Sequence, residues 1–164
     1  MRPVLTATVL FMAVTAAAGE PLTGRVVSIA DGDTLTVLDA ANVQHKVRLA
    51  GIDAPERGQP FGTVARDRLA TLAMGKPVAV IGGKRDKYGR TLARVEIEGQ
   101  DAGHRLVAEE LAWHYVRYSD DARLAAAERE ARAARRGLWR DPAPVAPWEW
   151  RASERDRKAV PAGR

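Results

Sequence analysis

Cysteine is absent from this sequence of 164 residues, and aromatic residues make up only 5% of it. The first absence excludes disulfide bonds, thiolate catalysis and zinc sites built on cysteine. The second argues against binding that relies on extensive stacking of nucleic-acid bases. The fold must therefore be stabilised by packing alone, to which a bound cation could add.

The charge and the hydrophobic content are those of a single basic domain. Hydrophobic residues make up 46% of the sequence and charged residues 29%, which predicts one globular unit with its own core. Lysine and arginine outnumber aspartate and glutamate, so the formal net charge is +5 and the pI is near 10.0. A basic domain of this kind favours a polyanionic partner, although charge says nothing about the fold.

An apolar run lies at the N-terminus. It covers Val4–Ala18, follows the basic residue Arg2 and ends in three alanines. A membrane-spanning helix needs about 20 apolar residues, whereas a basic start, a short apolar run and small residues are typical of a secretory signal. We therefore predict that residues 1–18 are a cleaved signal peptide. The mature protein is then secreted or periplasmic, without stable membrane association. A buried N-terminal helix and a retained anchor are the alternatives.

Apolar residues at a spacing of two predict five strands. β-Branched residues at this spacing are typical of strands, which are expected at residues 24–29, 34–38, 43–52, 77–81 and 92–97. Helical spacing predicts three helices. The first is expected after residues 59–62 and stops at Gly75, the second runs from an Asp101 cap through Ala112, and the third runs from Ser119 or Asp120 to Arg136.

This order of elements predicts an OB-type fold. A five-stranded barrel would have one helix inserted between its third and fourth strands and two helices C-terminal to it. We expect this domain to span residues 20–140 and to be a monomer. The tail at residues 141–164 contains prolines and tryptophans, and we expect it to pack through the tryptophans and then fray. The fold alone does not establish a function.

Three candidate site carboxylates stand in two polar motifs at the ends of predicted strands. Asp33 belongs to Asp-Gly-Asp-Thr at residues 31–34, and Asp53 and Glu56 belong to Asp-Ala-Pro-Glu at residues 53–56. Each motif alone is also explained by a tight turn or by the end of a strand. Gathered in one cleft, Asp33, Asp53, a backbone carbonyl and waters would suit Ca²⁺ or another hard cation. Glu56 would then act on a water molecule.

Two arginines are further candidates for the site, one near these motifs and one in a third polar motif. Arg48 lies in the third predicted strand, and Arg90 ends a polar turn that also contains Lys87 and Tyr88. A surface arginine is usually a solvated ion-pair partner worth under ~1 kcal/mol, but its guanidinium can also hold two phosphate oxygens. Lys87 and Tyr88 are predicted to bind a phosphate or stack on a base. A cation, a base and positive charge together are what phosphodiester cleavage requires.

Three motifs in this order resemble those of the staphylococcal nuclease (thermonuclease) family. They are Asp-Gly-Asp-Thr, Arg-Leu-x-Gly-Ile-Asp-x-Pro-Glu and Asp-Lys-Tyr-Gly-Arg-x-Leu-Ala, and the similarity covers roughly residues 22–139. The segment Pro-Trp-Glu-Trp-Arg at residues 147–151 also resembles bacterial members. One motif would be weak, whereas three in order on a matching pattern of strands and helices are specific. The resemblance implies Ca²⁺-dependent hydrolysis of DNA and RNA, with single strands preferred and 3′-phosphates left.

The resemblance also implies a role for each motif residue. Asp33 and Asp53 would bind Ca²⁺, with the Ala54 carbonyl assisting. Glu56 would be the general base that takes a proton from the attacking water. Arg48 and Arg90 would be the catalytic arginines that stabilise the five-coordinate phosphorus. Arg90 would also assist the departing 5′-oxygen.

The sequence departs from the family in its loops, and two other interpretations remain. The segment from Glu56 to the first helix lacks the lysine-rich insertion of the staphylococcal enzyme, and Glu109-Glu110 stands where many relatives have a basic residue and a glycine. The first alternative is a noncatalytic OB-type nucleic-acid-binding or interaction module. The second is a nuclease supported by Mg²⁺ or Mn²⁺, since all three ions accept oxygen ligands.

Overall fold

The computed structural model describes residues 21–159, so the predicted signal peptide lies outside the described residues. The long strands are β1 (Leu22–Asp31), β2 (Thr34–Leu38), β3 (Gln44–Leu49), β5 (Pro77–Arg85) and β6 (Thr91–Ile97). The two-residue strands are β4 (Ile52–Asp53), β7 (Gln100–Asp101) and β8 (Trp113–His114). The helices are α1 (Gly62–Ala73), α2 (Ala102–Ala108), α3 (Ala122–Ala134), the 3₁₀ helix η1 (Gly137–Arg140) and α4 (Pro147–Ala159).

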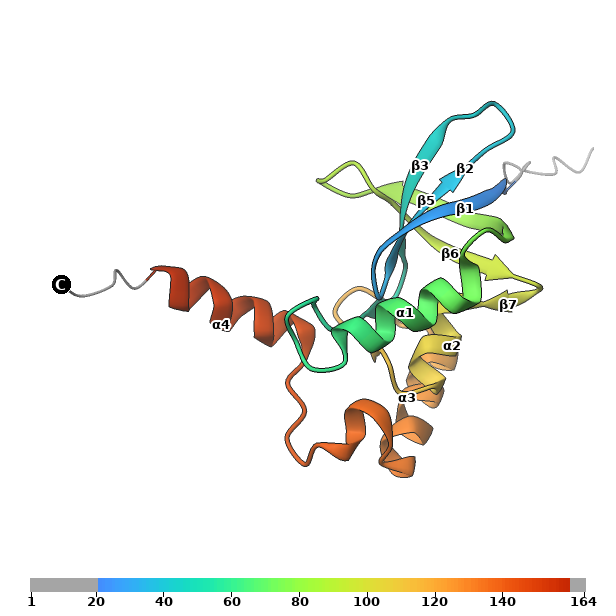
Figure 1. Cartoon of the computed structure of the whole chain (residues 1–164). Helices are drawn as coiled ribbons and strands as arrows, with labels where there is room; N and C mark the ends of the chain where they lie inside the picture. The colour runs from blue at the N-terminus through green and yellow to red at the C-terminus, as the bar shows by residue number, and fades with distance from the viewer. Residues whose placement is uncertain (1–20, 160–164) are drawn as a thin grey trace, which may run out of the picture.

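The five long strands close into a mixed barrel (Figure 1). The strand order is β3-β2-β1-β5-β6-β7, with antiparallel neighbours throughout. A parallel pairing of β3 with β6, in which Val47 lies opposite Thr91 and Arg48 opposite Leu92, closes the ring. The predicted five-stranded OB-type barrel, with a helix inserted between its third and fourth long strands, is confirmed.

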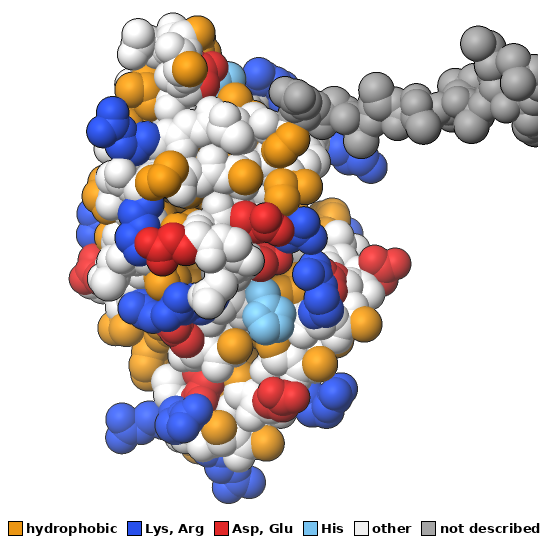
Figure 2. Space-filling view, turned by 90° about the vertical axis from the view of Figure 1, so that its right-hand side faces the viewer, with side chains coloured by type: hydrophobic (Ala, Val, Ile, Leu, Met, Phe, Trp, Pro, Cys, Tyr) orange, Lys and Arg blue, Asp and Glu red, His pale blue; other side chains and the backbone are white. Residues whose placement is uncertain are grey.

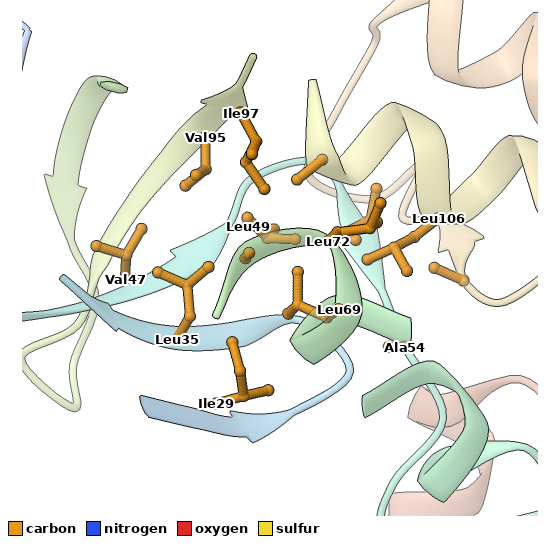
Figure 3. Close-up of a cluster of buried hydrophobic side chains, with 14 of the residues drawn as sticks. Ile29, Leu35, Val47, Leu49, Ala54, Leu69, Leu72, Val95, Ile97 and Leu106 are labelled. Atoms are coloured by element: carbon orange, nitrogen blue, oxygen red, sulfur yellow. The ribbon is translucent and has the colours of Figure 1, made fainter. Parts of the chain in front are cut away.

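The barrel interior is filled by alternate side chains of the strands. On β6, Ala93, Val95 and Ile97 are buried, as the two-residue period of a strand requires. Figure 3 shows side chains of the strands meeting Leu69 of α1 and Leu106 of α2 in one cluster. Burial of a side chain of this size contributes about 1.5–3 kcal/mol. The two helices therefore complete the core and hold the barrel end that faces them.

Several predicted boundaries were wrong: β1 and β5 are longer than expected, and α3 ends at Ala134 and not at Arg136. At two further boundaries, single residues turn the backbone. The strand expected at residues 43–52 is divided, since Gly51 has a φ of 76° and the chain leaves β3 before forming β4. The second helix begins at its predicted cap, because the Asp101 carboxylate accepts hydrogen bonds from Gly103 N and His104 N. It ends at Ala108 and not at Ala112, and Glu110 beyond it has a left-handed φ of 65°.

The cap of the third helix was also misplaced. Asp121, not Ser119 or Asp120, precedes α3, and its Oδ1 accepts a hydrogen bond from Arg123 N at 2.8 Å. The Ser119 hydroxyl instead accepts from Asp121 N at 3.2 Å, two residues before the bond that caps the helix. Adjacent residues that can all cap a helix are not ranked by sequence alone.

The C-terminal segment is a helix where fraying was expected. Of its two tryptophans, Trp148 packs as expected: it lies against the cluster that contains the buried Trp113 and Trp139, whose ring centroids are 4.5 Å apart. The chain then continues as α4 to Ala159, with Pro147 in the first helical position, where the missing N–H costs nothing. Figure 1 shows α4 meeting the body at its N-terminal end and projecting away from it. Among the described helices none is long and apolar enough to cross a membrane.

Candidate active site at the rim of the barrel

Asp33 is buried in the turn that joins β1 to β2. Its side chain accepts hydrogen bonds from the Thr34 hydroxyl at 2.9 Å and from Ala54 N at 3.2 Å, so it ties this turn to the end of β4. The approach is close because residue 32 is glycine. A Cβ atom there would lie 2.7 Å from Ala54 Cβ and 2.8 Å from Ala65 Cβ. The Asp-Gly-Asp-Thr motif is thus both a turn and the floor of a polar site.

Arg48 connects the two aspartates. Its Nη1 donates to Asp33 Oδ1 at 2.8 Å and its Nη2 to Asp53 Oδ1 at 2.6 Å. The backbone places these groups: Arg48 lies opposite Thr34 in the β2–β3 ladder, and Asp53 lies opposite Trp113 in the β4–β8 ladder. Both aspartate side chains are almost completely buried. Strand register therefore fixes Arg48 and Asp53, while the turn between β1 and β2 fixes Asp33.

Glu56 lies in the loop after β4 and is the accessible carboxylate of the site, with 39% of its side chain exposed. The loop is held by Gln59, whose side-chain oxygen accepts from Glu56 N at 3.1 Å and whose N donates to Glu56 O at 2.8 Å. The start of α1 packs on the same carbonyl, since a Cβ at Gly62 would lie 1.9 Å from it. The short loop leaves Glu56 in contact with water while fixing its backbone.

Arg90 directly precedes β6, which runs beside β3, and its side chain turns to Asp86. Nε of Arg90 donates to Asp86 Oδ2 at 2.8 Å, and the Asp86 carboxylate also accepts from the backbone N–H groups of Tyr88 and Arg90. Burial alone would raise the pKa of Asp86, but the hydrogen bonds from Arg90 and Tyr88 lower it overall. Lys87 and Tyr88 stand on this turn, where Tyr88 is 71% exposed.

Arg151 of α4 is a member of the site that the sequence interpretation missed. Its Nη2 donates to Asp53 Oδ2 at 2.7 Å and its Nη1 to Asp53 Oδ1 at 3.1 Å and to Glu56 Oε1 at 2.6 Å. It comes from a position 98 residues beyond Asp53. The resemblance of Pro-Trp-Glu-Trp-Arg to bacterial relatives was a signal, but it carried no chemical role.

Burial and neighbouring charge oppose each other within this cluster. Burial raises the pKa of Asp33 to about 7 even though the Arg48 guanidinium lowers it, and the nearby carboxylates of Asp31 and Asp53 raise it further. Burial would lower the pKa of Arg48, but Asp33 and Asp53 raise it overall. The pKa of Arg151 is raised too, because its bonds to Asp53 and Glu56 outweigh partial burial. The site therefore has more negative charge than its surroundings readily stabilise.

The donor set fits a hard cation. Asp33 and Asp53 supply two carboxylates next to the Ala54 backbone, and an additional positive charge would favour the ionised form of Asp33. Over residues 21–159 no three Asp, Glu or His side chains gather as a ready-made metal cluster. Waters would therefore complete the coordination, as is usual for ions that prefer oxygen.

Six residues were assigned to catalysis or metal binding. The structure brings four of them into direct contact at the rim of the barrel: Asp33, Arg48, Asp53 and Ala54. Glu56 joins them through Arg151. Arg90 lies in the turn before the neighbouring strand β6 and is paired with Asp86 instead. A closed barrel with two buried carboxylates and two partly exposed guanidiniums at its rim defines a protein of the OB type.

Comparison with known proteins identifies the family. The family model of staphylococcal nuclease homologues matches residues 46–141. A protein of Shigella flexneri named micrococcal nuclease is 43% identical over 168 aligned positions, covering 95% of this chain and 94% of its own. A protein of Haemophilus influenzae named uncharacterized endonuclease is 41% identical over 146, covering 89% and 82%.

A plant relative shares the domain within a longer chain. The Arabidopsis thaliana protein named staphylococcal-like nuclease CAN1 is 41% identical over 110 positions, which are 67% of this chain and 34% of that one. The chain described here belongs to the family of staphylococcal nuclease homologues. The resemblance drawn from the three motifs is confirmed.

Proposed function

We propose that this protein is a Ca²⁺-dependent nuclease that hydrolyses DNA and RNA and leaves 3′-phosphates. Membership of the family supports the broader class, a hydrolase that cleaves nucleic acid. The observation that carries the finer proposal is the placement of Arg48 between the buried Asp33 and Asp53, with the accessible Glu56 beside them. This arrangement offers oxygen ligands, a base and a phosphate-binding group within one connected network.

Asp33, Asp53 and the Ala54 carbonyl would hold the cation. When bound, Ca²⁺ would stabilise the negative charge that builds up on the phosphate in the transition state. The protein's contribution here is rigidity, because the two carboxylates are buried and tied to strand and turn backbone. Preorganised ligands of this kind need little rearrangement when the reaction occurs.

Glu56 is the proposed general base. Its carboxylate is 39% exposed, so a water molecule can reach it, and its backbone is fixed by Gln59. It would take a proton from that water as the water attacks phosphorus. Arg48 and Arg90 would donate N–H groups to the oxygens of the five-coordinate phosphorus. Arg90 would also assist the departing 5′-oxygen, once its guanidinium turned from Asp86 to the substrate.

The substrate would meet the polar turn between β5 and β6. Tyr88 is 71% exposed, and Lys87 Nζ lies 5.0 Å from the centre of its ring, so a base and a phosphate could be bound side by side. The opposite face, which Figure 2 shows, has basic side chains interspersed with acidic ones and no continuous basic stripe. We propose local contact at the β5–β6 turn, with single strands as the preferred substrates of a monomeric enzyme.

We further propose that the enzyme acts outside the cytoplasm, secreted or in a periplasm. The support is the sequence of residues 1–18, which has the pattern of a cleaved signal peptide. N-terminal sequencing of the protein exported by its host would test this. A mature N-terminus after residue 18 is expected, and an intact Met1 on the exported protein would contradict it.

The enzymatic proposal is tested by incubating single-stranded DNA and RNA oligonucleotides with Ca²⁺, Mg²⁺, Mn²⁺ or a chelator. Cleavage with Ca²⁺, loss of cleavage with chelator and 3′-phosphate ends are expected. Equal cleavage in chelator would contradict the cation, and 5′-phosphate ends would contradict the mechanism. Salt-sensitive binding without cleavage under every condition would instead support a noncatalytic nucleic-acid-binding module.

A further inference from the structure

Arg151 is bonded to the carboxylate of Asp53, which is one of the proposed ligands of the cation. Its two terminal nitrogens reach both oxygens of Asp53, and Arg48 adds a second bond to Oδ1. A carboxylate has about four lone-pair positions, and three contacts from two cations already surround this one. Asp53 has no exposed surface, so a metal ion must share oxygens that Arg151 now covers.

Of the two guanidiniums at Asp53, that of Arg151 is the easier to displace. Arg48 is 16% exposed and stands in a strand paired on both sides, whereas Arg151 is 34% exposed and comes from a terminal helix. Helix α4 buries only Pro147 fully, and its residues from 155 onward are exposed. Solvent screens the partly exposed guanidinium of Arg151 more than that of Arg48, so the contact of Arg151 with Asp53 is the more easily replaced of the two.

The attachment of α4 lies close to Arg151. Trp148 stacks on Tyr115 with ring centroids 4.9 Å apart and an interplanar angle of 3°, and it meets Trp113 edge-on at 5.5 Å. Just before the helix, Val145 O accepts a hydrogen bond from Gln59 Nε2 at 2.7 Å, in the same loop that carries Glu56. These contacts hold the first turn of α4 on the rim of the barrel. Because Arg151 lies in the next turn of the same helix, its contacts with the site and the position of α4 depend on each other.

Arg151 also restrains the proposed base. Its Nη1 bonds Glu56 Oε1 at 2.6 Å while bonding Asp53 Oδ1 at 3.1 Å, so one nitrogen links the proposed metal ligand to the proposed base. Any force that draws Arg151 from Asp53 therefore loosens its hold on Glu56 as well. Metal binding and release of the base are coupled through this one side chain.

We propose that Arg151 is a positioning residue that competes with the cation for Asp53. In the metal-free protein it neutralises Asp53 and holds Glu56; cation binding displaces it and frees both the carboxylate oxygens and the base. Helix α4 thereby senses whether the cation is bound. This inference rests on the proposed function, because it needs a cation at Asp33 and Asp53.

The test is the affinity of the full mature chain for Ca²⁺, measured by titration calorimetry without substrate. Arg151→Gln removes the competing charge and is expected to tighten Ca²⁺ binding about tenfold, which is about 1.4 kcal/mol. Arg151→Lys keeps a charge but not the two-pronged contact, and it is expected to fall between Gln and wild type. Arg157→Gln is the matched control, since it removes an equal charge from the exposed part of α4.

Hydrogen exchange gives a second readout. In the wild type, Ca²⁺ is expected to speed amide exchange in residues 147–159, while in Arg151→Gln exchange in this helix is already fast and unaffected by Ca²⁺. Equal Ca²⁺ affinity in wild type and Arg151→Gln, or weaker binding in the variant, would overturn the competition and leave the cation site standing. No Ca²⁺ binding by either protein would contradict the cation site itself, and with it the proposed function.

Discussion

The barrel rim and the C-terminal helices place their charged side chains in different ways. At the rim, Asp33 and Asp53 are buried and fixed by strand pairing and by a turn around a glycine. Arg151 is one-third exposed and reaches Asp53 and Glu56, but not Asp33, from a helix anchored by its first turn. The difference indicates that the barrel holds the proposed metal ligands in fixed positions, whereas Arg151 of α4 controls when those ligands are accessible.

Replacing the proposed base should have the largest effect. Glu56→Gln keeps the shape of the side chain but removes its basicity, so kcat should fall by ~10²–10⁴. Multiple-turnover cleavage of a single-stranded oligonucleotide measures this. Glu98→Gln, which changes an exposed glutamate paired with Lys76, is the matched control. An unchanged kcat in Glu56→Gln would show that the rim does not supply the base.

Removing either proposed phosphate-binding arginine should have the second-largest effect on activity. Arg48→Ala and Arg90→Ala each remove a donor to the transition state, so kcat/KM should fall by ~10²–10³. Arg48→Ala should also lower thermal stability, because it leaves the buried carboxylates of Asp33 and Asp53 without their shared partner. Arg66→Ala, at an exposed position, should change neither quantity. Full activity in Arg90→Ala would mean that this arginine stays with Asp86 during catalysis.

The rigidity of the rim can be tested through the loop that carries Glu56. A methyl group at position 62 would meet the Glu56 carbonyl oxygen, so Gly62→Ala should cost about 1–3 kcal/mol of unfolding free energy and lower kcat. Gly58→Ala is the matched control in the same loop, since its Cβ would meet nothing within 4 Å. Urea unfolding and cleavage assays measure both. If the two variants behave alike, close packing at Gly62 does not position Glu56.

The smallest effect is expected in the C-terminal part, away from the chemistry. Asp121→Ala removes the cap of α3 and should cost about 1 kcal/mol with little change in kcat. Hydrogen bonds from the side chain and backbone of Arg123 lower the pKa of Asp121 to about 2. The stabilisation is therefore present above the unfolded pKa near 3.8 and lost as pH falls toward 2.

Unfolding curves across pH test this sign. Wild type should be more stable than Asp121→Ala at pH 6, and the difference should shrink between pH 4 and pH 2. Asp120→Ala, at the exposed neighbouring position, serves as control. A difference that grew as pH fell would contradict the assigned pKa shift.

Sequence reasoning succeeded where local patterns and motifs carried the information. Alternating residues such as those of β6 predicted the barrel, and the three motifs predicted the family that the comparisons show. It failed where the outcome depended on tertiary contacts. The left-handed backbone at Glu110 ended α2 early in a stretch whose apolar spacing still favoured a helix.

Arg151 could not have been assigned from the sequence for the same reason. Nothing near it in the chain is part of the site, and its partners lie 95 and 98 residues earlier. Its placement depends on how Trp148 stacks against Tyr115, which is a consequence of the folded barrel and not of local spacing. The tail was consequently expected to fray, although the packing expected of its tryptophans is found for Trp148.

The central claim is that Asp33 and Asp53 hold a cation required for cleavage. The most direct measurement is the single-turnover rate of oligonucleotide cleavage as a function of Ca²⁺ concentration, for the wild type and Asp33→Asn. Asp33 has no contact with Arg151 in the described structure, so this variant leaves the latter's bonds to Asp53 and Glu56 in place. With one of two carboxylate ligands lost, the half-saturating Ca²⁺ concentration should rise by at least about tenfold. An unchanged Ca²⁺ dependence in a correctly folded Asp33→Asn variant would contradict the account.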